Sequence, residues 1–273
     1  MDLKELEDIP PWEWGEDSGT TIRKVLADAQ AEVSDRILAA EFATEFTVLC
    51  DELAETLLTV VESNDEPAEL RGKAAISLGP VLEYCDTMEF EDPEDDPISE
   101  EVFKKIQHSL KKLYEDPALP TIVRRRVLEA GVRAPEEWQK KAVRAAYYSK
   151  DKDWHLTAVF CMRFIQGFKK EILESLHSPE PEIQYHAVQA AGGWELDDAW
   201  DYVASLATSE QTEKSLRLAA IEAIATIRPE EAVAILHELI HSEDDDIVEA
   251  AYEAMGYAEA AADLGEFDED DDW

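Results

Sequence analysis

The sequence predicts an all-α protein built as a right-handed α-solenoid of stacked helix pairs, and three observations lead to this prediction. An apolar pattern with helical spacing recurs along the chain, shorter amphipathic segments precede its copies, and the interval between copies is nearly constant. A period of about 30 residues is typical of repeat proteins, in which each unit buries its apolar face against its neighbours. The 273 residues are therefore expected to extend an array rather than enclose one core.

The recurring pattern places apolar or small residues at positions 1, 5, 8 and 9 of a ten-residue window, which form one widened face of a helix. The copies begin at Leu70, Val123, Trp154, Ile183, Leu216 and Ile247. From the second copy onward, the starts follow one another at a nearly fixed interval, whereas the first interval is much longer. The longer interval contains the acidic stretch EFEDPEDDP, so we expect a surface loop over residues 86–97.

A shorter amphipathic segment precedes the later copies, at residues 171–182, 200–211 and 231–246. Each has Leu or Ile at helical spacing and ends in a polar break, where Ser and Asp can cap the next helix. We therefore expect about six helix pairs within residues 20–258, in which residues 20–45 form an N-terminal capping pair.

These pairs resemble the HEAT repeat, whose second helix carries Leu/Val-Arg-x-x-Ala-Ala. The resemblance covers about residues 46–258, and the short period is similar to that of phycobilisome-lyase-type HEAT proteins. The family's Arg position is filled in turn by Arg71, Arg124, His155, Gln184, Arg217 and Val248. An Arg–Asp ladder between repeats is therefore expected to be incomplete. The resemblance implies a protein-binding scaffold.

The two ends of the chain differ from the repeats. Residues 1–19 are acidic and rich in Pro and Trp, and Trp12 and Trp14 either fix this segment to the first helices or dock a partner. Residues 259–273 are expected to be a disordered acidic tail. No secretion signal or membrane span is expected. The three cysteines lack zinc-site spacing, and we interpret them as buried free thiols of a cytoplasmic protein.

Charge is unevenly distributed along the chain, whose net charge is −39. Residues 1–100 hold 6 basic and 28 acidic side chains, and residues 171–273 hold 3 basic and 28 acidic. Residues 101–170 reverse this balance with 16 basic and 8 acidic side chains. So acidic a chain is not expected to bind nucleic acid or anionic membrane. A high-salt host and a basic partner both remain open as explanations of the acidity.

The basic stretch is the candidate binding site on the concave face. Its residues are Arg124, Arg125, Arg126, Lys140, Lys141 and Arg144. They either bind an acidic peptide, a phosphate or a nucleic-acid strand, or they neutralise acidic side chains of the chain itself. We favour the second interpretation. Aromatic residues in the same stretch, including Phe160 and Phe164, either stack on a ligand or fill the core, and core filling is the commoner role.

Residues 237–241 spell His-Glu-Leu-Ile-His, the zincin signature. On a helix, His237 and His241 would share one face and could bind zinc, with Glu238 as general base. Candidate third ligands are Glu249, Glu253 and Glu259. The apolar stripe of this segment leaves both histidines on the solvent side, however, so we expect no metal and no cofactor.

We therefore predict a non-enzymatic adaptor that binds another protein through the concave face and the acidic ends. One alternative is an enzyme, either a zinc hydrolase through residues 237–241 or a chromophore-handling protein like the phycobilin lyases that the repeats resemble. The other alternative is an acidic mimic or chaperone that occupies a basic partner.

Overall fold

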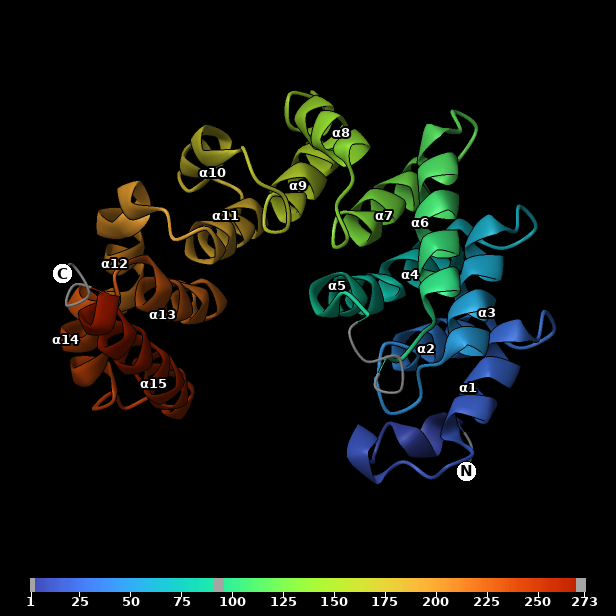
Figure 1. Cartoon of the computed structure of the whole chain (residues 1–273), viewed down its shortest axis with the longest axis horizontal. Helices are drawn as coiled ribbons and strands as arrows, with labels where there is room; N and C mark the ends of the chain where they lie inside the picture. Colours follow the sequence, from blue (N-terminus) through green and yellow to red (C-terminus); the bar gives the residue numbers. More distant parts are fainter. Residues whose placement is uncertain (1–2, 91–95, 269–273) are drawn as a thin grey trace. The chain divides into compact units, whose positions relative to one another are not determined.

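The computed structural model describes residues 3–90 and 96–268, and over these residues it contains helices and no β-strand (Figure 1). The chain is an α-solenoid of helix pairs, as the periodicity predicts. It divides into two compact units, Met1–Ala145 and Ala146–Trp273, which are described separately. Within the described part of the chain, no helix is both long and apolar enough to span a membrane.

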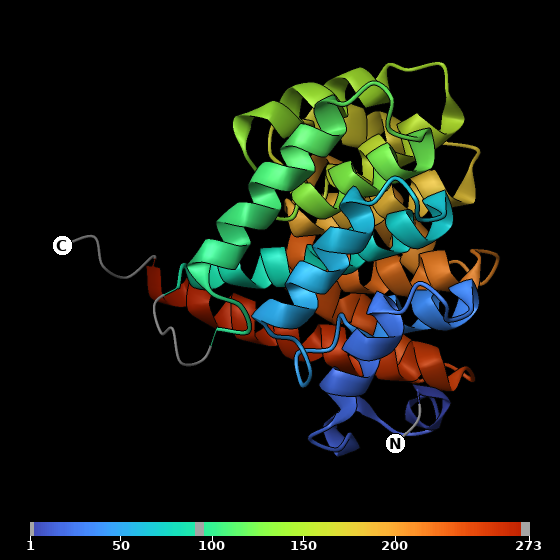
Figure 2. The same cartoon turned by 90° about the vertical axis from the view of Figure 1, so that its right-hand side faces the viewer.

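The N-terminal unit begins with two short 3-10 helices, η1 (Leu3–Leu6) and η2 (Pro11–Glu13). Its helices are α1 (Ser18–Ala27), α2 (Val33–Phe42), α3 (Asp51–Glu62), α4 (Ala68–Ser77), α5 (Gly79–Met88), α6 (Glu100–Glu115) and α7 (Thr121–Gly131). The helix α8 (Glu137–Tyr147) crosses the boundary between the units. The second helices α2, α4 and α7 stack in series, and the first helices α1, α3 and α6 stack beside them. Figure 2 shows α3 and α6 side by side.

The C-terminal unit repeats this arrangement. Its helices are α9 (Lys152–Cys161), α10 (Lys169–Ser175), α11 (Pro181–Gly193), α12 (Trp200–Thr208), α13 (Lys214–Ile227), α14 (Pro229–Leu239) and α15 (Asp245–Asp268), with η3 (Asp197–Ala199) before α12. The second helices α9, α11, α13 and α15 stack in series (Figure 1). Each second helix from α4 to α15 begins two positions before a predicted pattern start, so the register of the repeat is confirmed.

One side chain near the start of a second helix bonds back to the first helix of its pair. The Nε of Arg36, Arg71 and Arg217 each donates to a carbonyl oxygen of the preceding helix, at 2.9–3.0 Å. Where Arg is missing, Gln184 Nε2 donates to Leu176 O and His155 Nδ1 donates to Tyr147 O, at 3.0 and 2.8 Å. These bonds satisfy carbonyl groups at the C-terminus of the first helix that its own turns leave unpaired.

Neighbouring repeats are joined by ion pairs between their turns. Arg36 pairs with Glu66, Lys152 with Glu180, and Lys214 with Asp244, and each pair links a second helix to the equivalent turn of the next repeat. These Arg–Glu, Lys–Glu and Lys–Asp pairs form a partial ladder between repeats, which agrees with the expectation that an Arg–Asp ladder is incomplete. The Arg36 pair is the buried one, with its side chain 4% exposed and both carboxylate oxygens of Glu66 accepting bonds.

The long interval between the first two pattern copies contains the helix α5, which the repeat pattern did not predict. The helix α4 ends at Ser77, and α5 begins directly after its C-cap residue, at Gly79. Pro80 lies in the first turn of α5, where its missing N–H costs no hydrogen bond. A Cβ on Gly79 would lie 2.7 Å from Cδ of Arg133, so this glycine also allows close approach to the following repeat.

The proposed loop and tail are partly occupied by helix. Residues 86–88 belong to α5, and residues 91–95 of the expected loop lie outside the described residues. The helix α15 continues from the last repeat to Asp268, because the Ala-rich segment after Glu259 holds no Pro. Residues 269–273 of the proposed tail lie outside the described residues.

The two tryptophans of the N-terminal segment, Trp12 and Trp14, differ in their surroundings. Trp14 donates from its indole Nε1 to Ile9 O at 2.8 Å, and its ring meets Phe42 edge-on with centroids 5.2 Å apart. Trp14 therefore fixes the segment to α2. Trp12 is 78% exposed and makes no such contact in the described residues.

Candidate protein-binding face

The basic residues predicted to form one site belong to different helix layers of the N-terminal unit. Arg124, Arg125 and Arg126 lie on α7, a second helix, whereas Lys140, Lys141 and Arg144 lie on α8, the first helix of its pair. The first two arginines are half-buried. Arg126 pairs with the buried Glu129 and packs over Gly72 of α4.

Much of the basic stretch binds the chain's own acids. The pairs are Lys104–Glu100, Lys105–Glu55, Arg126–Glu129, Arg133–Glu83, Lys152–Glu180, Lys169–Asp198 and Lys170–Glu174. Several of these acidic partners, such as Glu55 and Glu180, belong to an adjacent repeat. Many basic side chains of the basic stretch are therefore neutralised by acidic side chains of the same chain.

The two histidines of the zincin signature are exposed. His237 lies on α14, and His241 lies just beyond its last residue, Leu239. Their ring centroids are 5.8 Å apart. Within the described residues, no group of three or more His, Cys, Asp or Glu side chains could hold a metal, so the structure brings no third ligand to this pair.

A cluster of partly exposed side chains joins α9 to α11 in the C-terminal unit, and we call it the aromatic cluster. It consists of Phe160, Arg163, Phe164, Tyr185, His186 and Gln189. All six are half-buried. Phe160 meets Phe164 and His186 with centroids 5.5 and 5.3 Å apart.

Hydrogen bonds hold the cluster in one arrangement. His186 Nδ1 donates to Gln189 Oε1 at 3.2 Å, and Gln189 Nε2 donates to the hydroxyl of Tyr185 at 3.1 Å. The guanidinium of Arg163 lies 5.3 Å from the ring centroid of Phe164. Amphipathic aromatic side chains of this kind, fixed before binding, lose little conformational entropy in a complex.

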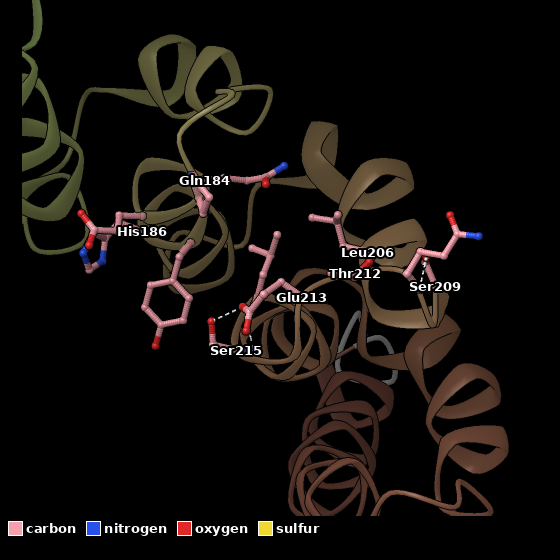
Figure 3. Close-up of a pocket in the computed structure, with 12 residues that line it drawn as sticks. Gln184, His186, Leu206, Ser209, Thr212, Glu213 and Ser215 are labelled. Carbon is pink, nitrogen blue, oxygen red and sulfur yellow. Dashed lines mark hydrogen bonds between the residues drawn. The ribbon is translucent and has the colours of Figure 1, made fainter.

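A groove of about 600 Å³ adjoins the cluster, and Tyr185 and His186 belong to both. It lies between the N-terminal turns of α11 and α13 and is closed by the loop that follows α12. Its other lining residues are Pro181, Glu182, Gln184, Leu206, Ser209, Gln211, Thr212, Glu213, Ser215 and Leu216. Figure 3 shows Glu213 between the α11 side chains and those of the α12–α13 loop.

Glu213 is the N-cap of α13. Its Oε2 accepts hydrogen bonds from the backbone N–H groups of Ser215 and Leu216, at 3.0 and 3.2 Å, and from the Ser215 hydroxyl. These bonds lower the pKa of the Glu213 carboxyl, so it carries a negative charge near neutral pH. The groove therefore combines apolar walls with a fixed carboxylate.

Sequence reasoning missed most of this surface. Tyr185, His186 and Gln189 share one face of the repeat pattern, and their polarity and size at those positions could have indicated a surface role. Core filling describes Phe160 and Phe164 only in part, because both are half-buried. It does hold for Phe168, which is 1% exposed, and for Tyr147, which is 8% exposed.

The thiols follow the sequence interpretation in part. None of the three cysteines is in a disulfide within the described part of the chain; Cys85 and Cys161 are buried, and Cys50 is half-buried. Burial raises the pKa of Cys85 to about 11, which keeps it protonated and unreactive at neutral pH.

Residues 170–256 match the family model for HEAT repeats. This segment contains α11–α14 in full, most of α10 and the first half of α15, and the other described pairs repeat the same design. Residues 170–256 are therefore HEAT repeats.

Similar solved structures cover most of the chain at low identity. The archaeal HEAT-like repeats protein from Thermococcus onnurineus NA1 is 17% identical, with a TM-score of 0.37, over 90% of this chain and 99% of that chain. Human deoxyhypusine hydroxylase in complex with glycerol is 16% identical, with a TM-score of 0.39, over 90% and 97%. Kap121p is 12% identical, with a TM-score of 0.45, over 94% and 31%. No curated protein matches the chain significantly.

Proposed function

We propose that the chain is a cytoplasmic, non-enzymatic scaffold that binds another protein through the second-helix face of its C-terminal unit. The observation that carries this proposal is the continuity of the aromatic cluster with the groove, since both use Tyr185 and His186 on α11. Rigid, partly exposed aromatic side chains beside a concave surface are the usual core of a protein interface.

Binding is favoured over catalysis by the chemistry at hand. The HELIH pair lies on the exposed side of a first helix, without a third ligand among the described residues. HEAT arrays also offer an extended surface formed by many repeats, which suits a macromolecular partner better than a small substrate. The acidic segments 1–19 and 259–273 remain proposed contact segments for the same partner.

The proposal is tested by affinity capture from the native host's lysate, with Tyr185→Ala compared against Tyr148→Ala. Tyr148 directly follows the first helix α8 and is 63% exposed, so its variant is a matched control for the loss of a tyrosine ring. We expect Tyr185→Ala to lose a protein that wild type and Tyr148→Ala both retain. Equal capture by all three chains, or no specific capture by wild type, would contradict the proposal.

A second variant tests the basic stretch. Charge reversal at Lys140, Lys141 and Arg144 changes α8 without touching the internal contacts of Arg126. Loss of the partner from this variant, with retention by Tyr185→Ala, would move the contact surface to the basic stretch. Deleting residues 259–273 tests the acidic end in the same way, since loss of the partner from this variant would place the contact there.

A further inference from the structure

The groove between α11 and α13 presents acids that the chain itself does not neutralise. The side chain of Glu182 makes no hydrogen bond or ion pair within the described part of the chain. Glu213 uses Oε2 to cap α13, and Oε1 accepts none of those bonds. Both residues are exposed at the groove rather than buried in it.

The basic residues of this part of the chain are committed elsewhere. Residues 171–273 contain only three, Lys214, Arg217 and Arg228. Lys214 pairs with Asp244 and Asp246, and Arg228 pairs with Asp197. The Nε of Arg217 donates to a backbone carbonyl oxygen 3.0 Å away. The surrounding segment therefore keeps a strongly negative potential over the groove.

The walls of the groove are suited to a long aliphatic stem. Leu206 and Leu216 supply aliphatic surface, and Tyr185 supplies a ring. Lysine and arginine bury three or four methylene groups along apolar surface while their charged ends remain near water or a carboxylate. An acidic side chain would be repelled by Glu213, and a purely apolar one would add no partner for its Oε1.

We infer that the groove receives a lysine or arginine side chain from an extended segment of the partner protein, with the cation paired to Glu213 and its stem against Leu206 and Leu216. This inference rests on the proposed scaffold function and adds the chemistry of the partner. Glu182, on the facing helix, strengthens the field at the entrance. The same groove and field select against an acidic segment.

Three labelled peptides test the inference on the full chain by fluorescence anisotropy in about 50 mM NaCl, where exposed charges are weakly screened. The peptides are (Lys-Ala)4-amide, (norleucine-Ala)4-amide and (Glu-Ala)4-amide, each with the same fluorophore on its N-terminal amine. We expect the lysine peptide to bind most tightly, the norleucine peptide weakly and the glutamate peptide not at all. Norleucine binding equal to lysine binding would overturn the role of the cation.

Variants locate the contact. Glu213→Gln keeps a side-chain oxygen for the helix cap and removes the charge, so we expect binding of the lysine peptide to weaken about threefold to fivefold. Glu230→Gln is the matched control, because it removes the same charge from the exposed first turn of α14, outside the groove. Thr212→Trp fills the groove without a charge change and should weaken the lysine and norleucine peptides alike.

The outcomes separate the inference from the proposed function. Equal loss in Glu213→Gln and Glu230→Gln would show diffuse attraction to an acidic protein and overturn the groove assignment. Unchanged affinity in Thr212→Trp would do the same. In either case the scaffold proposal still holds if wild type captures a protein from lysate that Tyr185→Ala does not capture. If Tyr185→Ala captures the same proteins as wild type, the scaffold proposal is wrong, whatever the peptides show.

Discussion

Two adjacent glycines at the end of α11 are expected to respond to alanine substitution with opposite signs. Gly192 is buried against α13, and a Cβ placed on it would lie 2.8 Å from the Cβ and 2.9 Å from the Cα of Ala223. Gly193 is exposed, and a Cβ there would meet nothing within 4 Å. The pair isolates the close approach of two stacked second helices.

The magnitude follows from two opposing effects. Alanine in place of glycine inside a helix adds up to about 1 kcal/mol of stability through its higher helix propensity. Overpacking a rigid contact costs about 1–3 kcal/mol, and here the obstructing atoms include backbone, which cannot rotate away. Thr226 Oγ1 also donates to Gly192 O at 2.9 Å, so a shift of α13 would strain that bond. We expect Gly192→Ala to lose about 1–2 kcal/mol of unfolding free energy and Gly193→Ala to gain a few tenths.

The assay is urea unfolding followed by circular dichroism in the far ultraviolet, with thermal melts as a second measure. Because repeat arrays depart from two-state behaviour, the midpoint of the transition of each variant is compared at equal slope. The reasoning is refuted if Gly192→Ala is as stable as wild type, or if both variants shift in the same direction by the same amount. Either result would mean that α11 and α13 do not approach as closely as Ala223 requires.

Three further predictions concern charge and protonation. Arg36→Leu leaves Leu26 O and the Glu66 carboxylate without their buried partner, and should cost about 2–3 kcal/mol in urea unfolding, against under about 1 kcal/mol for the exposed pair lost in Lys152→Leu. The pKa of Cys85 is raised from 9.0 to about 11 in the folded chain, so on raising the pH the thiol ionises first in the unfolded chain. The contribution of Cys85 to the free energy of unfolding is therefore intact below pH 9 and falls toward pH 11, and Cys85→Ala should lose this pH dependence. Since the net charge is −39, NaCl from about 0.05 to 1 M should raise the Tm by roughly 5 °C, and an unchanged or lower Tm would contradict a dominant self-repulsion.

The register of the repeats could be predicted because burial alone dictates it. Apolar residues at positions such as Leu216 and Ile224 have one low-energy place, between neighbouring helices, so their spacing fixes where each second helix begins. The helix α5 escaped prediction because Gly79 and Pro80 satisfy two descriptions, the end of one helix and the start of another. The local sequence is compatible with both, and the packing of α5 against α7 favours the start of a second helix.

The candidate face was harder to predict because it depends on which half-buried side chains meet across repeats. Phe160 and His186 lie on the second helices of successive repeats, and only the stacking of α9 on α11 brings their ring centroids to 5.3 Å. The basic stretch attracted attention because charge is visible in a sequence, whereas the acids that neutralise it are distant. Arg133 and Glu83, which come from different repeats, are an example.

The last repeat has Val248 at the position where five other second helices donate a hydrogen bond to the first helix of their pair, through Arg36, Arg71, His155, Gln184 and Arg217. Valine has no polar group, so no side chain at this position can bond across the α14–α15 pair. At this position the α14–α15 pair is therefore held by apolar packing and not by a side-chain hydrogen bond, so its cohesion there depends on burial alone.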